Sequence, residues 1–94
     1  MSTFQFAPAQ EQEVLMKEQV LPEHQLILYN DDVNTFDWVI ESLMDICSHE
    51  RLQAEQCSLI VHYKGKCAVK DGEIGKLRPM CEALVDRGLS AVIE

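Results

Sequence analysis

Basic residues are scarce in this sequence. Eight lysines and arginines stand against sixteen aspartates and glutamates, and the formal net charge is -8 at pH 7. A chain this acidic is repelled by the phosphates of nucleic acids and of anionic membranes, so we expect neither as a partner. The imbalance is strongest from Glu23 to Glu55, where Arg51 is the single basic residue. A cationic ligand suits this surface better than an anionic one.

Long apolar runs and metal-binding cysteine spacings are also absent. No segment approaches transmembrane length, and Met1 to Gln10 lacks the basic start and unbroken apolar core of a signal peptide, so we expect a cytoplasmic protein. No Cys-x-x-Cys pair occurs. We therefore expect neither metal nor other cofactor, and interpret all four cysteines as reduced and mostly buried: Cys47, Cys57, Cys67 and Cys81.

Chain length limits this protein to one small domain. At 94 residues there is room for a single core, and a deep, enclosed active site would be difficult to build. Residues 1–24 are rich in Gln, Glu and Ala without a sustained apolar period, which predicts a flexible N-terminal extension. Residues 25–94 are then the folded domain, which we expect to be monomeric.

Apolar periodicity predicts three strands and three helices in this domain. Asn34 is a candidate N-cap for the first helix, and Gly65 is a candidate C-cap for the second. The expected elements are a strand at 26–29, helices at 35–47 and 50–63, a strand at 67–70, a helix at 76–87 and a strand at 89–93. The fold class is α+β, with a small three-stranded antiparallel sheet, three helices on one face and the order βααβαβ.

Finer patterns give expectations for single side chains. Trp38 and Ser42 should project outward from the first helix together with its charged residues. The later part of the second helix is apolar almost all round. Its side chains should therefore be buried, including those of Leu59, Ile60 and Tyr63.

Turn and proline signals mark the second half of the chain. Asp71 and Gly72 should form a turn after the second strand. Pro79 should lie in the first turn of the third helix or kink it.

Two short motifs carry the functional signal. The run LYNDD stops a strand at Asn30, Asp31 and Asp32, residue types favoured where a chain turns. Later in the chain, His62 begins the run HYKGK and shares a polar stripe with Ser58 on an otherwise apolar helix. A histidine there could also be a core residue bonded to a neighbour.

Together, LYNDD and HYKGK at this separation resemble the ClpS family. ClpS is a non-enzymatic adaptor that captures N-degron proteins by their N-terminal residue and hands them to a Clp AAA+ unfoldase. The resemblance covers residues 25–94 and implies that they form a substrate-recognition domain. The implied partners are N-degron substrate proteins and the N-terminal domain of a ClpA- or ClpC-like unfoldase. In the family, an N-terminal extension helps to pass on the cargo.

The resemblance also implies a site for a protein N-terminus. Asn30, Asp31 and His62 match the positions that hold the α-amino group, and they offer the acceptors that an ammonium needs. Asp32 and Asn34 match the rim of the pocket. The hydrophobic cavity, which in the family takes Leu, Phe, Tyr or Trp, is matched by Leu28, Phe36, Val39, Ser58, Val61 and Leu89.

This sequence departs from the family pattern in the cavity. The family commonly has Thr-Pro-Met after the acidic turn, where this chain has Asn34, Thr35 and Phe36. It also usually has a Met where this chain has Ser58, which empties space that Phe36 could partly refill. We therefore expect a reshaped cavity whose preference among N-terminal residues differs from the family norm.

Three other kinds of protein share parts of this pattern. A thiol enzyme could pair Cys67 with His62, whereas Cys57 lies too far around the helix from His62. A metal site could use Asp31, Asp32 and His62, although their spacing identifies no metal. A protein-interaction domain with altered or lost N-degron binding is the third, because the C-terminal domain of the ribosomal stalk protein is similar to ClpS in fold. That domain lacks the paired motifs, which favour the adaptor.

Overall fold

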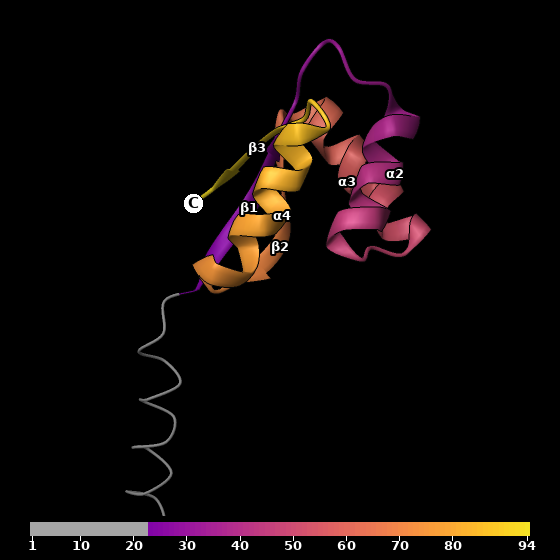
Figure 1. Cartoon of the computed structure of the whole chain (residues 1–94). Helices are drawn as coiled ribbons and strands as arrows, with labels where there is room; N and C mark the ends of the chain where they lie inside the picture. The colour runs from indigo at the N-terminus through magenta and orange to yellow at the C-terminus, as the bar shows by residue number, and fades with distance from the viewer. Residues whose placement is uncertain (1–22) are drawn as a thin grey trace, which may run out of the picture.

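Six elements follow one another in the computed structural model, which describes residues 23–94 (Figure 1). They are β1 (His24–Tyr29), α2 (Phe36–Cys47), α3 (Arg51–Lys64), β2 (Lys66–Gly72), α4 (Ile74–Asp86) and β3 (Ser90–Ile93). The predicted order βααβαβ and the α+β class are confirmed. The predicted extension falls almost entirely on residues outside the described range, and β1 begins at His24, two residues before the expected strand.

The sheet is built around β1. Its strand order is β2-β1-β3, and both pairings are antiparallel, as predicted. Leu28 of β1 lies opposite Cys67 on one side and Ala91 on the other. The register with β2 shifts between Leu26 and Ile27, which marks a bulge in that ladder. The central strand therefore ends with neighbours on both sides, next to the LYNDD turn.

The helices cover one face of this sheet. Alternate side chains of a strand point to opposite faces, and Leu26 and Leu28 join the core cluster beneath the helices. Leu43, Leu77 and Leu84 supply fully buried side chains from the helical layer. Within residues 23–94, no helix is long and apolar enough to cross a membrane.

The first helix is capped by a different residue than the sequence predicted. Thr35, not Asn34, is the N-cap, and its side chain accepts a hydrogen bond from the Trp38 backbone N–H. Trp38 is half-buried against the core, and its indole N–H donates to the Arg87 carbonyl at 3.0 Å. Ser42 is fully buried. The outward positions expected for Trp38 and Ser42 were wrong because α4 and the residues after it cover that side of α2.

The second helix is less buried than its composition suggested. Its predicted C-cap, Gly65, is confirmed with a φ of 92°, and the Gly65 N–H donates to the Val61 carbonyl. Leu59, Ile60 and Tyr63, however, are 48%, 41% and 78% exposed. The small core contacts only the side of α3 that lies opposite these three residues. An apolar residue on this helix is therefore not always buried.

In the second half, the predicted turn was wrong, and one of the two positions expected for Pro79 is excluded. Asp71 and Gly72 continue β2 and pair with Gln25 and His24, so they are not a turn. Helix α4 starts earlier than expected, which places Pro79 beyond its first turn. A proline there removes one backbone donor from the helix.

Candidate functional site

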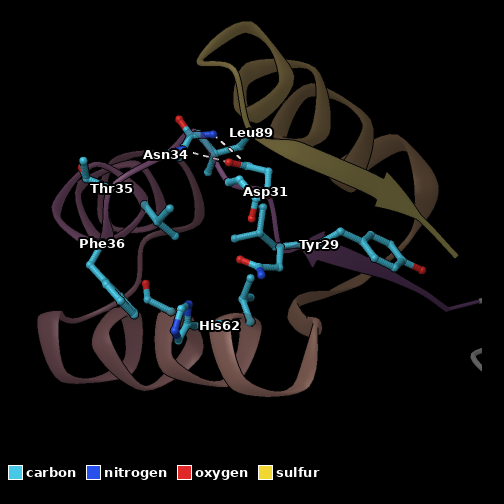
Figure 2. Close-up of a pocket in the computed structure, with 13 residues that line it drawn as sticks. Tyr29, Asp31, Asn34, Thr35, Phe36, His62 and Leu89 are labelled. Carbon is cyan, nitrogen blue, oxygen red and sulfur yellow. Dashed lines mark hydrogen bonds between the residues drawn. The ribbon is translucent and has the colours of Figure 1, made fainter.

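A cavity of about 300 Å³ opens where β1 ends, beside the start of α2 and the last turns of α3 (Figure 2). Thirteen residues line it. They include every residue that the sequence assigned to the site, namely Leu28, Asn30, Asp31, Asp32, Asn34, Phe36, Val39, Ser58, Val61, His62 and Leu89. The two motifs, far apart in the sequence, therefore meet around one cavity.

Two hydrogen bonds hold the loop between β1 and α2 in place. At its start, the Asn30 N–H donates to the Gly65 carbonyl at 2.9 Å, next to the end of α3. Near its end, the Asn34 side-chain amide donates to the Gly88 carbonyl at 2.9 Å, just before β3. The loop is thus tied to both neighbouring parts of the fold, which fixes the distance across the cavity.

Asp31 organises the inside of this loop. Its Oδ1 accepts the backbone N–H groups of Val33 and Asn34, at 2.9 and 2.8 Å. Its Oδ2 accepts the Asn34 side-chain amide at 2.8 Å, drawn as a dashed line in Figure 2. Burial raises the pKa of Asp31, but the hydrogen bonds from Asn34 and Val33 outweigh it and lower this pKa below its ordinary value. The carboxylate is therefore ionised at neutral pH.

Asp31 has acceptor capacity left after these three bonds. A carboxylate offers about four lone-pair positions, two on each oxygen. Oδ1 uses both of its positions, whereas Oδ2 uses one. Within residues 23–94, one position on Oδ2 remains for a donor at the cavity.

His62 faces this loop from α3. Its imidazole lies 5.2 Å from the Phe36 ring, centroid to centroid, at an interplanar angle of 59°. Figure 2 shows both rings on one side of the cavity and Asp31 on the other. His62 also lies in the last turn of its helix, where backbone carbonyls carry partial negative charge. This end of the cavity combines negative charge with hydrogen-bond acceptors.

The deeper part of the cavity is mostly apolar. Leu28, Val61 and Leu89 are buried and line it, as does the half-buried Val39. Phe36 is 44% exposed and forms part of the wall. The site can therefore hold a ligand with a polar, positively charged end and an apolar end.

Two lining residues were given no role by the sequence. Tyr29 belongs to LYNDD, but Figure 2 shows its ring pointing away from the cavity. Thr35 lines the cavity beside Phe36 and also caps α2. A threonine just before an apolar helical face is itself an N-cap signal, so the sequence contained a sign of this role.

The thiol and metal alternatives find little support in this arrangement. None of the cysteines is among the lining residues. The Cys67 thiol instead donates to the neighbouring Ala68 carbonyl at 3.5 Å. Asp31, Asp32 and His62 line one cavity, yet residues 23–94 contain no group of three His, Cys, Asp or Glu side chains that could hold a metal ion.

Comparison with known proteins identifies the family. Residues 19–91 match the family model described as ATP-dependent Clp protease adaptor protein ClpS. The chain belongs to the ClpS family. It is therefore an adaptor of an ATP-dependent Clp protease, as the paired motifs suggested.

Curated ClpS proteins and a solved structure agree with this assignment. The ClpS of Synechococcus elongatus is 31% identical over 86 residues, which cover 90% of each chain. The ClpS of Campylobacter jejuni is 42% identical over 53 residues, 54% of this chain and 55% of that protein. Agrobacterium tumefaciens ClpS2 bound to L-phenylalaninamide shares the fold, with a TM-score of 0.76 at 18% identity, over 79% of this chain and 96% of that one.

Proposed function

We propose that this ClpS protein captures N-degron proteins by their free N-terminal residue and delivers them to a Clp AAA+ unfoldase. The supporting observation is the position on Asp31 Oδ2 that no donor among residues 23–94 occupies, at the mouth of a cavity whose deeper part is mostly apolar. In this proposal the α-ammonium binds at the mouth, and the first side chain enters the cavity.

The polar residues of the cavity are assigned to the ammonium end of the ligand. An α-ammonium has donors and no acceptor, so each partner must accept a hydrogen bond. We assign this role to Asp31 Oδ2, to the Asn30 amide oxygen and to a ring nitrogen of His62. Asp32, exposed on the rim, adds negative charge, and Asn34 holds Asp31 in place.

The rest of the cavity is assigned to the apolar end of the ligand. We assign a bulky N-terminal side chain to the space between Leu28, Phe36, Val39, Ser58, Val61 and Leu89. Phenylalaninamide, the ligand named for the Agrobacterium protein, has a free amino group, a phenyl side chain and no terminal carboxylate. It therefore resembles the first residue of a polypeptide, which supports the same type of ligand here.

The remaining parts of the proposal concern delivery. We assign recognition to residues 25–94 and a role in cargo transfer to residues 1–24. The partner is the N-terminal domain of a ClpA- or ClpC-like unfoldase in the cytoplasm, and the adaptor acts as a monomer. Degradation of a reporter protein with an N-terminal Phe by a reconstituted Clp protease should depend on this adaptor, and a reporter with an N-terminal Ala should not be degraded.

Peptide binding tests the recognition step directly. Fluorescence anisotropy with labelled peptides that start with Leu, Phe, Tyr, Trp, Ile or Ala should show selective binding of bulky residues. N-acetylation of the Phe peptide should abolish binding because it removes the positive charge and two donors. His62→Ala should weaken binding about 10- to 100-fold, the effect of losing one hydrogen bond to a charged group.

The matched control is Gln56→Ala, an exposed position on the same helix outside the cavity, which should bind like the wild type. Equal binding of the free and acetylated Phe peptides would contradict the proposal. The protein would then be a ClpS-fold interaction domain whose N-degron binding is altered or lost.

A further inference from the structure

Ser58 is a polar residue in the deep part of the cavity. It is 3% exposed, a burial similar to that of its apolar neighbours Leu28, Val61 and Leu89. Any side chain that fills the cavity displaces water from this part of it. The hydrogen-bonding capacity of Ser58 therefore bears on which side chain is bound best.

The hydroxyl hydrogen of Ser58 is already engaged in a hydrogen bond within the protein. It donates to the Ala54 carbonyl one turn earlier on α3, at 2.8 Å. A hydroxyl oxygen has two lone pairs in addition to its one hydrogen, and within residues 23–94 no group donates to this oxygen. Ser58 is thus available to a ligand as an acceptor and not as a donor.

The wall beside Ser58 is aromatic. Phe36 and His62 form a tilted pair whose ring centroids lie 5.2 Å apart, and both rings line the cavity. Aromatic rings prefer tilted or offset contacts with other rings, so a third ring gains more here than an aliphatic chain of similar area. The wall favours an aromatic ligand, and the acceptor favours one that carries a donor.

We infer that this adaptor selects N-terminal tyrosine and tryptophan over phenylalanine and leucine, because Ser58 accepts a hydrogen bond from the phenol or indole at the far end of the bound side chain. This inference rests on the proposed function and specifies its cargo. Phenylalanine and leucine present only C–H groups to Ser58, so its oxygen loses water without gaining a partner. A site that bonds a ligand donor discriminates against the analogue that lacks it.

The test compares peptides that differ only at the first residue. Tyrosine should bind about 2- to 10-fold more tightly than phenylalanine, the effect of one neutral hydrogen bond. 4-Fluorophenylalanine is close to tyrosine in size but has no donor, and it should bind like phenylalanine. This comparison uses the wild-type protein, so it does not depend on the folding of any variant.

Variants then locate the acceptor. Ser58→Ala should bring the tyrosine-to-phenylalanine ratio close to 1, with phenylalanine binding kept or improved. Ser42→Ala is the matched control, because Ser42 is a buried serine that does not line the cavity, and it should keep the wild-type ratio.

Each remaining outcome counts against the inference. It is overturned if 4-fluorophenylalanine binds as tightly as tyrosine, or if the preference persists in Ser58→Ala. If all bulky residues bind equally and acetylation abolishes binding, the proposed function holds and this inference fails. If no peptide with a free N-terminus binds, both fail.

Discussion

The Asp31 carboxylate, which we propose binds the ligand, also holds its own loop in place. Three of its acceptor positions fix Val33 and Asn34, and no donor in the described part of the chain occupies the fourth, at the cavity. Because the loop bonds restrain the carboxylate, a ligand would meet an acceptor already oriented for it. Binding would then cost little additional ordering of this side chain.

The lowered pKa of Asp31 makes a prediction about acid stability. A carboxyl whose pKa is depressed by folding stabilises the protein above its unfolded pKa, and this contribution is lost as pH falls through the folded pKa. Wild type should therefore be more stable than Asp31→Asn at pH 7, and this difference should shrink below about pH 4. Urea denaturation at a series of pH values measures it.

Glu41→Gln serves as the control, since Glu41 is an exposed carboxyl on α2. Its stability should follow that of the wild type across the series. A constant difference between wild type and Asp31→Asn down to pH 2 would show that the hydrogen bonds do not act through the ionised carboxylate.

At the scale of elements, the start of α2 connects stability to the cavity. The Thr35 hydroxyl oxygen accepts the Trp38 N–H at 3.2 Å, and both Thr35 and Phe36 line the cavity. Thr35→Ala should lower the free energy of unfolding by about 1 kcal/mol, the usual cost of losing an N-cap. Thr35→Ser keeps the hydroxyl and should retain most of this stability in chemical denaturation. Equal destabilisation by both variants would point to the Thr35 methyl group instead.

The sequence could not choose between two adjacent caps. Asn34 and Thr35 are both good N-cap residues before the apolar face that begins at Phe36. The choice depends on Gly88, whose carbonyl accepts the Asn34 side chain from far along the chain. The types of the elements and their order could be predicted from local periodicity. The identity of the N-cap could not, because it depends on a contact between residues far apart in the sequence.

At the scale of the whole molecule, the packing of α3 on β2 protects a thiol. Burial, mainly, together with the neighbouring thiols of Cys67 and Cys47, raises the pKa of Cys57 to about 12. Since the thiolate is the reactive form, iodoacetamide at pH 8 should label Cys57 in the native protein far more slowly than the half-buried Cys67. Denaturant should remove the difference, as measured by mass spectrometry of peptides. Equal native labelling rates would contradict this packing of α3 on β2.

The residues that line the cavity were more predictable than the exposed surface. All residues of LYNDD line the cavity, and HYKGK contributes His62 to the same lining. The exposure of Leu59 and Tyr63 could not be predicted, because composition does not reveal how far a small core extends around a helix. Sequence motifs indicate which residues belong to the cavity. How deeply an apolar side chain on a helix is buried depends on the complete fold.

The bond from Asn34 to the Gly88 carbonyl has a consequence for synthesis on the ribosome. It joins residues 54 positions apart, and Leu89, which lines the deep part of the cavity, comes directly after Gly88. Contacts this distant in sequence form only after the intervening chain has been made and has folded back. A nascent adaptor whose Gly88 is still inside the exit tunnel therefore lacks a complete cavity until that segment has emerged.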